Sequence, residues 1–262
     1  NLWKSSESTI QGKTLMEILK QLLKQIPKQI INDILTIIYP DHCIGCDKIL
    51  KSGESKWVCN DCSYHFEIRD YRKCEICGRI IYHRGKCRIC NSEKVYFDKG
   101  YSVFEYKEAV RNAIREFKYR GMFRYGRYLG EIMADYAADN INTEFDYVTA
   151  VPLHPKRYRG RGYNQSEILA KAVAKALGVE YRKLLVRCVN TKPQNSLDRK
   201  ERLKNIKGAF SIKDNVSVEN KNILIIDDIF TTGSTVNECS RILKNNRALR
   251  VEFFALSCRS ED

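Results

Sequence analysis

The residues best suited to chemistry lie together in the run ILIIDDIFTTGST, which spans Ile223 to Thr235. Four apolar residues lead into Asp227 and Asp228, and two adjacent carboxylates can each accept a hydrogen bond from one of two neighbouring hydroxyls. A turn rich in hydroxyls and backbone N–H groups follows: Thr231, Thr232, Gly233, Ser234 and Thr235. Gly233 would let the backbone approach a ligand closely. This pattern predicts a site for a phosphorylated ribose.

A buried strand and a helix are needed to position these residues. The apolar run predicts a strand over 222–227 in a parallel sheet, and ligands bind beyond the carboxyl ends of such strands. The helix expected to begin near Ser234 adds its positive N-terminal end, which favours a phosphate. The simpler interpretation is a strand, a turn and a Ser/Thr helix cap with two solvated aspartates. Thirteen residues in register favour the binding site.

From about residue 95 the chain alternates between strands and helices. Helices are expected over Glu108–Tyr119 and Gln165–Leu177, with Gly178 ending the second. The segment 95–106 alternates like two paired strands with a turn between them. Further strands are expected at 145–152, 181–188 and 249–257. This order predicts an α/β fold with a mostly parallel sheet.

Eight of the eleven cysteines form four CxxC pairs: Cys43, Cys46, Cys59, Cys62, Cys74, Cys77, Cys87 and Cys90. In a chain that opens without a signal-peptide pattern, such pairs indicate Zn²⁺ rather than disulfides. Four thiolates suit a closed, structural Zn²⁺ site, so two sites are expected. Short spacers favour sequential pairing into two ribbons, and interleaved pairing stays open. Gly45 and Gly78 could take the tight backbone that such turns need.

Size and charge limit the classes of function. With 262 residues and 43% hydrophobic residues, the chain can bury one sizeable core and a small satellite domain, which excludes a disordered protein. No apolar run is long enough to cross a bilayer. Because the cysteine pairs indicate zinc rather than disulfides, a reducing cytoplasm is the expected compartment. The formal charge of +14 favours polyanionic partners, and solubility alone is the plainer explanation.

Basic and aromatic side chains interleave along and beyond the 108–119 helix. The candidates for contacts with nucleic-acid phosphates are Arg111, Arg115, Lys118, Arg120 and Arg124, with Arg199 and Arg202 from a later loop. The interleaved aromatic residues are Tyr119, Phe123, Tyr125 and Tyr128. Cations with aromatic rings suit single-stranded nucleic acid. The alternative is a solvated helix face whose aromatic residues belong to the core.

Residues 1–38 form an N-terminal extension. Apolar residues from Leu15 to Ile26 repeat with helical spacing, and Pro27 should break or kink the helix before the pattern resumes. An amphipathic helix packed on its own domain is favoured, and a helix for a partner or a membrane surface is the alternative. The expected domains are therefore the extension 1–38, a double zinc-ribbon domain over 39–94 and an α/β domain over 95–262.

The run from Ile223 to Thr235 closely resembles the phosphoribosyl-pyrophosphate (PRPP) motif of type I phosphoribosyltransferases. Three further stretches resemble the ComF family of competence-associated proteins: AVRNAIREFKYRG (109–121), VPLHPKRYRGRGYNQSEILA (151–170) and QNSLDRKERLKNIKGAF (194–210). A cysteine-rich ribbon domain placed in front is also similar to that family. The resemblance covers about Cys43 to Ser257. It implies a type I phosphoribosyltransferase fold, a mostly parallel sheet flanked by helices, preceded by a small zinc-ribbon domain.

The resemblance also implies roles for residues. Asp227 and Asp228 would hold the ribose hydroxyls of PRPP, Thr231 to Thr235 would hold its 5′-phosphate, and Mg²⁺ would accompany the pyrophosphate. The turn from His154 to Gly162 would be the pyrophosphate loop, with these residues: Lys156, Arg157, Arg159, Arg161 and Gly162. The segment 194–205 would be a loop that closes over the site. A hood for the acceptor would come from the N-terminal region, most simply the zinc domain.

In function, the resemblance implies a phosphoribosyltransferase-like protein that binds PRPP and assists the uptake of single-stranded DNA in natural transformation. The partners it implies are PRPP, single-stranded DNA and other competence proteins such as the DNA-uptake helicase. The protein would then lie in the cytoplasm, including peripherally at the uptake machinery. The alternatives are an active phosphoribosyltransferase of nucleotide salvage and a PRPP-sensing regulator with no role in DNA uptake.

Overall fold

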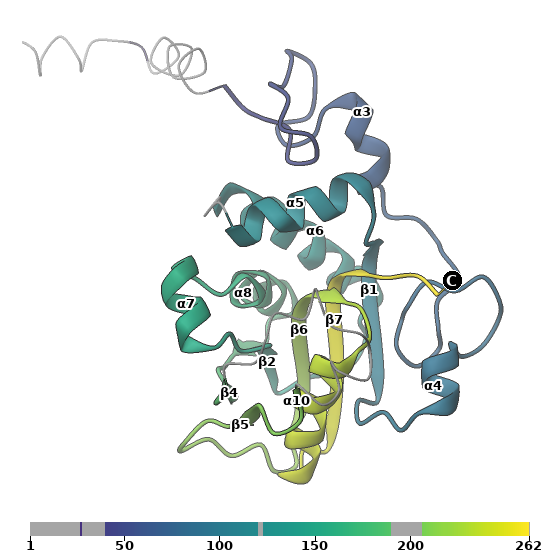
Figure 1. Cartoon of the computed structure of the whole chain (residues 1–262), viewed down its shortest axis with the longest axis vertical. Helices are drawn as coiled ribbons and strands as arrows, with labels where there is room; N and C mark the ends of the chain where they lie inside the picture. The colour runs from purple at the N-terminus through teal and green to yellow at the C-terminus, as the bar shows by residue number, and fades with distance from the viewer. Residues whose placement is uncertain (1–26, 28–39, 120–122, 190–205, 262) are drawn as a thin grey trace, which may run out of the picture.

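A five-stranded parallel sheet forms the centre of the protein (Figure 1). This computed structural model describes residues 27, 40–119, 123–189 and 206–261. In spatial order the strands are β1 (Lys99–Glu105), β7 (Arg250–Cys258), β6 (Asn222–Phe230), β2 (Tyr147–Ala150) and β3 (Glu180–Tyr181). Both central strands carry near-continuous apolar runs, as expected for strands buried on both faces.

The central strand β6 extends beyond its neighbour β2. Its pairing with β2 ends at Ile226, opposite Ala150, whereas its pairing with β7 continues to Phe230. Asp227 and Asp228 therefore lie inside β6 and not after its end, which corrects the predicted limit of 227. They nevertheless lie past the carboxyl end of β2, where the sheet opens on that side.

Helices cover both faces of the sheet. On one face lie α5 (Glu108–Tyr119), α6 (Phe123–Asn140) and α8 (Gln165–Leu177), and on the other lies α10 (Ser234–Asn245). Alternate residues of β6 serve the two layers, because Leu224 packs with the first group and Ile225 with α10. The predicted bounds of α5 and α8 are confirmed, and Gly178 ends α8 in the left-handed conformation.

The prediction of two paired strands over 95–106 is wrong. The segment contains one strand, β1, which is buried along most of its length and pairs in parallel with β7. Before β1, the rings of Phe97 and Phe253 pack edge to face with centroids 4.8 Å apart. The backbone N–H of Asp98 donates to Val251 O at 2.7 Å. The apolar alternation thus belongs to one edge strand covered on both faces.

The strand predicted over 181–188 is interrupted. Its first residue ends β3, and Leu185–Arg187 forms β4 in a separate two-stranded sheet with β5 (Phe210–Ile212). The chain leaves the main sheet at Leu184, whose backbone N–H donates to Thr149 Oγ1 at 3.3 Å.

The predicted turn from His154 to Gly162 contains a short helix, α7 (Pro155–Arg161). His154 caps its start, because its Nδ1 accepts from the backbone N–H of Lys156 at 3.2 Å. Pro155 suits the first helical position, and Gly162 ends the helix. These local signals outweigh the many charges that make the segment look like an open loop.

The cysteine-rich region forms two separate ribbons, the first above α5 and the second beside β1 (Figure 1). The first ribbon, residues 43–62, joins the core of α5 and α6 and is followed by η1 (Tyr64–Phe66). The second ribbon, residues 74–90, joins the core of α10. Short helices begin in each: α3 (Asn60–Ser63) and α4 (Arg88–Ser92).

Some predictions lie outside the described residues. They are the extension 1–38 apart from Pro27, Arg120, the side chain of Phe123 and the closing loop 194–205, including Arg199 and Arg202. Within the described part of the chain, no helix is both long and apolar enough to cross a bilayer.

Candidate functional site

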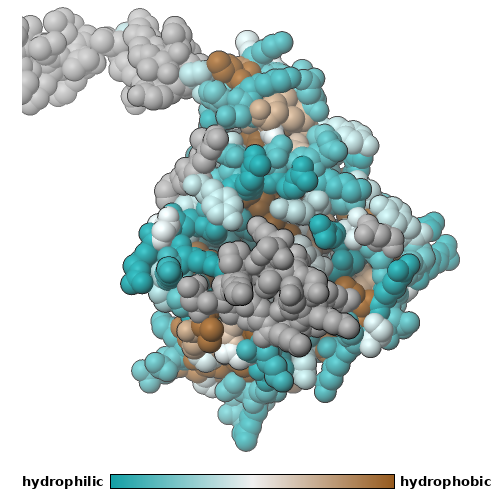
Figure 2. Space-filling model, viewed as in Figure 1, coloured by the Kyte–Doolittle hydropathy of each residue, from teal (hydrophilic) through white to brown (hydrophobic). Residues whose placement is uncertain are grey.

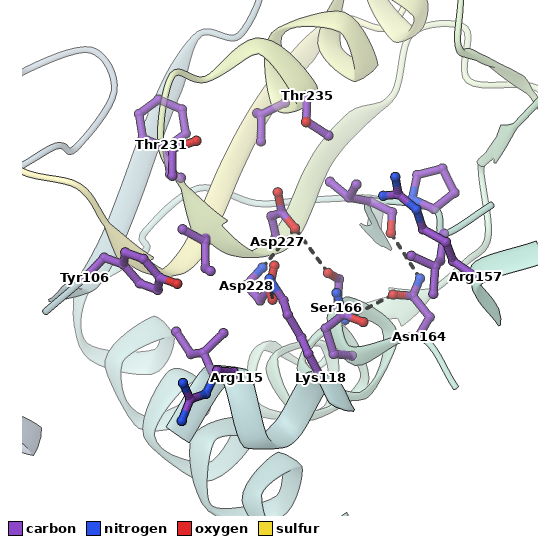
Figure 3. Close-up of a pocket in the computed structure, with 18 of the residues that line it drawn as sticks. Tyr106, Arg115, Lys118, Arg157, Asn164, Ser166, Asp227, Asp228, Thr231 and Thr235 are labelled. Atoms are coloured by element: carbon purple, nitrogen blue, oxygen red, sulfur yellow. Dashed lines mark hydrogen bonds and ion pairs between the residues drawn. The ribbon is translucent and has the colours of Figure 1, made fainter. Parts of the chain in front are cut away.

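A cavity of about 740 Å³ opens at the carboxyl end of β6 (Figure 3). Its floor is the pair Asp227 and Asp228, and the loop from Thr231 to Thr235 lies at one side. Side chains of α5, α7, α8 and β4 complete the lining. The fold therefore brings together all seven residues of the PRPP-like motif.

The two aspartates are held by different partners. Asp227 is 8% exposed, and its Oδ1 accepts from Ser166 Oγ at 3.1 Å and from the backbone N–H of Asp228 at 2.9 Å. Asp228 is 4% exposed, and its Oδ2 lies 2.5 Å from Lys118 Nζ. Burial, with the Asp228 carboxylate beside it, raises the pKa of Asp227 to about 7.

The loop from Thr231 to Thr235 leads directly into α10. Gly233 has φ 81° and stands at the N-cap of α10 with no side-chain capping bond. Thr232 Oγ1 lies 2.8 Å from Ser234 Oγ and accepts from the Ser234 backbone N–H at 3.4 Å. A Cβ atom at Gly233 would meet the Phe230 ring at 3.0 Å, so the turn needs glycine for both conformation and space. Hydroxyls and a helix N-terminus thus meet at the cavity.

Cationic side chains line two other sides. The α5 wall consists of Arg111, Arg115 and Lys118, and the α7 wall consists of Arg157 and Arg161 of α7 with Arg187 of β4. Burial and then the charge of Arg157 lower the pKa of Arg187 to about 10. Burial, followed by the charge of Arg161, also lowers the pKa of Arg157. An anionic ligand would relieve the repulsion within the α7 wall.

Several predicted residues do not line the cavity. Among the described residues of the predicted pyrophosphate loop, Lys156, Arg159 and Gly162 are exposed and lie outside the lining. Arg124 points to the first ribbon, with its guanidinium 3.3 Å from Asp41 and donating to His42 O at 2.9 Å.

The aromatic residues near α5 divide into two groups. Tyr125 is buried, and the ring of Tyr128 stacks on Trp57 with centroids 5.4 Å apart, so both belong to the core. Tyr119 is 68% exposed and lines the cavity. Arg161 lies over its ring, 5.3 Å from the centroid.

The lining residues that were not singled out from the sequence include Asn164, Ser166, Arg187 and Arg259. Asn164 caps α8 and its side chain donates to Val151 O at 3.0 Å, so the capping pattern N-x-S before a helix was the available signal. No sequence signal pointed to Arg187, because this residue is buried by the pairing of β4 with β5. No described residue of either ribbon lines the cavity, so the ribbons do not form the predicted hood.

The two cysteine groups fit Zn²⁺. Cys43, Cys46, Cys59 and Cys62 form one group and Cys74, Cys77, Cys87 and Cys90 the other, with all Sγ atoms of a group within 4.8 Å of one another. Sequential pairing is thereby confirmed. The Sγ atoms of Cys46 and Cys59 are 3.7 Å apart, as are those of Cys77 and Cys87. A tetrahedron with Zn–S bonds of about 2.3 Å has edges of about 3.8 Å.

Comparison with known proteins gives two domain matches and three informative relatives. The chain matches a double zinc ribbon domain over residues 34–91 and a phosphoribosyl transferase domain over residues 164–261. It is 30% identical to competence protein ComFC of Streptococcus pneumoniae over 214 residues, which cover 79% of this chain and 90% of that protein. It is 28% identical to competence protein F of Haemophilus influenzae over 225 residues, 82% of this chain and 95% of that protein.

A third relative matches over a shorter span. The DNA utilization protein YhgH of Escherichia coli K12 is 34% identical over 116 residues, 44% of this chain and 50% of that protein. The domain matches agree with the parallel sheet and with the cysteine groups in front of it. The chain thus belongs to the ComF family of competence-associated proteins, with a double zinc ribbon followed by a type I phosphoribosyltransferase fold.

Proposed function

We propose that this protein binds PRPP in the cavity at the end of β6 and handles single-stranded DNA during competence. One observation carries the PRPP assignment: a buried aspartate pair faces the same cavity as a hydroxyl-rich loop at a helix N-terminus. In this assignment Asp227 and Asp228 accept hydrogen bonds from the ribose hydroxyls. The loop from Thr231 to Thr235 receives the 5′-phosphate.

The α7 wall is assigned to the pyrophosphate. Arg157, Arg161 and Arg187 offer planar donors that suit phosphate oxygens, while Lys156 and Arg159 add charge from the exposed side of α7. Mg²⁺ bound with PRPP would neutralise part of the charge that develops on a departing pyrophosphate. A phosphoribosyl transfer here would need no nucleophilic side chain, because positioning and exclusion of water account for most of its chemistry.

The ion pair between Lys118 and Asp228 connects this assignment to α5. Lys118 Nζ lies 2.5 Å from Asp228 Oδ2 and therefore already occupies this carboxylate oxygen. The ribose hydroxyls would have to compete with Lys118 for it. Ribose binding would therefore release Lys118 to a phosphate group of the ligand. The acid pair and the α5 wall would then act as one site.

The α5 wall is assigned to single-stranded DNA. Arg111 and Arg115 are exposed at the cavity, and the exposed ring of Tyr119 lies beside them as a stacking platform. In the view of Figure 2, hydrophilic side chains cover most of the described surface, in keeping with a net charge of +14. The names of the relatives, competence protein and DNA utilization protein, favour DNA as the polyanion.

The aspartate pair gives the decisive test of the PRPP site. Replacing both residues with Ala, or with the isosteric Asn, should abolish PRPP binding in calorimetry while zinc content stays at two ions per chain by mass spectrometry. Fluorescence anisotropy with a labelled oligonucleotide should show DNA binding retained. Unchanged PRPP affinity in the double variant would disprove the site.

A further inference from the structure

The turns that carry the first CxxC pair of each ribbon share one backbone. The N–H of Cys43 donates to Lys48 O at 2.8 Å, and the N–H of Cys74 donates to Arg79 O at the same distance. An isolated β-bridge pairs His42 with Ile49, and a second one pairs Lys73 with Ile80, with the partners seven positions apart in each case. Lys48 and Arg79 therefore occupy equivalent positions in the two ribbons.

Their side chains have opposite surroundings. Lys48 is exposed and pairs with the exposed Asp61 at 3.3 Å. Arg79 is 5% exposed, and its guanidinium donates to Arg259 O at 3.0 Å and to Thr231 O. The same guanidinium lies 5.2 Å from the centroid of the Phe230 ring. Two carbonyls and an aromatic face offset the cost of burying this charge.

These contacts hold the start of the loop from Thr231 to Thr235 on the side that faces away from the cavity. Thr231 is its first residue, and the backbone N–H of Arg259 donates to Phe230 O at 2.9 Å. A trans peptide directs its C=O and the next N–H in opposite directions. By holding Thr231 O on its own side, Arg79 directs the Thr232 N–H away from the ribbon. Arg79 itself does not line the cavity.

The metal site determines where Arg79 starts. Gly78 precedes it with φ 63°, and a Cβ atom there would come within 2.3 Å of Gly100 O. Ser102 Oγ donates to Gly78 O at 2.7 Å, and the Gly100 N–H donates to Ile76 O at 2.7 Å. The ribbon is thus tied to β1 at the CxxC turn. Because a structural metal supplies much of the folding free energy of such a turn, metal loss would free Arg79.

We propose that Arg79 is a positioning residue that couples the second zinc site to phosphate binding by the loop from Thr231 to Thr235. The proposal rests on the proposed PRPP function and names the ligand group concerned, a phosphate monoester. Among the residues that the structure describes, the first ribbon contacts α5 instead: its Gly45 O accepts from Asn112 at 3.3 Å, and the matched Lys48 faces solvent. Zinc at the second site would therefore set phosphate affinity, and zinc at the first would not.

Arg79→Ala, Arg79→Lys and the matched control Lys48→Ala separate this role from general stability. Titration of each zinc-loaded variant with PRPP and with ribose 5-phosphate should show a loss of about 10- to 100-fold in affinity for Arg79→Ala, equivalent to about 1.4–2.8 kcal/mol. Arg79→Lys should lose less, because it keeps the charge but not the two-pronged donor. Lys48→Ala should bind like the wild type, and all three should keep two zinc ions per chain.

Hydrogen exchange of the backbone amides from 230 to 236 gives a readout that needs no ligand. Arg79→Ala should exchange these amides at least about 10-fold faster than wild type, with α8 unchanged as an internal control. If the wild type binds no PRPP, the proposed function fails, and this measurement still decides the linkage. Wild-type phosphate affinity, or wild-type loop exchange, in Arg79→Ala would overturn the proposal. If the variant does not fold, the same comparison is made with Arg79→Lys.

Discussion

The first zinc ribbon lies on α5, whereas the second lies against β1 and the back of the loop from Thr231 to Thr235. Their CxxC turns have the same hydrogen bonds, yet Ile49 is 58% exposed and the equivalent Ile80 is 1% exposed. The metal-binding repeat thus determines the backbone, and the neighbouring elements determine what each ribbon does. Each ribbon supports a different side of one cavity: the first supports the α5 wall and the second the loop.

Loss of a zinc ligand should give the largest difference between the two ribbons in their effect on PRPP binding. Cys77→Ser removes a ligand of the second site and Cys46→Ser a ligand of the first. Both should lower zinc content to about one ion per chain and lower the melting temperature, because structural zinc contributes folding free energy. Only Cys77→Ser should weaken PRPP binding, by at least about 100-fold. Equal losses in the two variants would remove the distinction between the ribbons.

The glycines of the two turns give the next largest effect, on stability. Gly78→Ala forces a Cβ atom against Gly100 O at a positive φ, and we expect it to cost about 3 kcal/mol or more. Gly45 has no positive φ, and its Cβ would meet Ala109 Cβ at 2.9 Å, so Gly45→Ala should cost about 1–2 kcal/mol. Chemical denaturation of the zinc-loaded proteins measures both. A larger loss for Gly45→Ala would reverse the expected order.

The conformational equivalent of Gly78 in the first ribbon is Asp47, with φ 65°. The sequence had suggested Gly45 for that role, so this part of the prediction is wrong. Asp47→Gly should be tolerated within about 1 kcal/mol, since glycine adopts this conformation without strain. The same denaturation series tests it.

The pH dependence of PRPP binding tests the role of the aspartate pair of β6 and of its partner Lys118 in α5. Because hydroxyl recognition needs an ionised carboxylate, affinity should rise about 10-fold from pH 6 to pH 8 for an Asp227 pKa of about 7. Lys118→Met removes a cation that lowers this pKa and should move the rise to higher pH. Calorimetric titration with PRPP between pH 6 and pH 8 measures the affinity, with Asp227→Asn as the control. Identical pH profiles in wild type and Asp227→Asn would contradict the assignment.

The contribution of Asp227 to folding stability should fall as pH rises, whereas PRPP affinity should increase. The folded protein holds the Asp227 proton more tightly than the unfolded chain, whose aspartate pKa is about 4. This residue's contribution to the free energy of unfolding is therefore fully present below pH 4 and is lost as pH rises through about 7. Asp227→Asn should remove that part of the pH dependence of denaturation.

The smallest effects should appear on the α5 wall, next to the first ribbon. Arg111→Ala and Arg115→Ala should each weaken oligonucleotide binding about 3- to 10-fold and reduce the salt slope by about 0.7, because each removes one phosphate contact. PRPP affinity should stay within about 2-fold. Anisotropy over a series of salt concentrations gives both quantities. An unchanged salt slope would place DNA elsewhere, and Lys48→Ala serves as the exposed-cation control.

Local patterns predicted a large part of this fold. The bounds of α5 follow from its apolar stripe, and α8 follows from its stripe and from Gly178. Sequential zinc pairing followed from spacer length, and the cavity brings together the seven residues of the PRPP-like run. In each case the signal lies within a few turns of one element, where periodicity and spacing are informative.

Contacts between distant segments could not be predicted in the same way. Arg79 and Thr231 are 152 residues apart, and nothing in either local pattern indicates their contact. The segment 95–106 looked like a hairpin because β1 is covered on both faces by ribbons and helices whose placement the sequence does not reveal. Arg187 reaches the cavity only because β4 leaves the main sheet. Tertiary packing decided all three.

Calorimetric titration of the zinc-loaded wild-type protein with PRPP, with and without Mg²⁺, tests the central claim most directly. We expect one PRPP bound per chain, with affinity at least about 10-fold higher in Mg²⁺ because the cation neutralises the pyrophosphate beside the buried aspartates. Absence of PRPP binding in the presence of Mg²⁺, while oligonucleotide binding stays tight and salt-sensitive, would contradict the claim. It would leave the cavity as part of a DNA-handling surface.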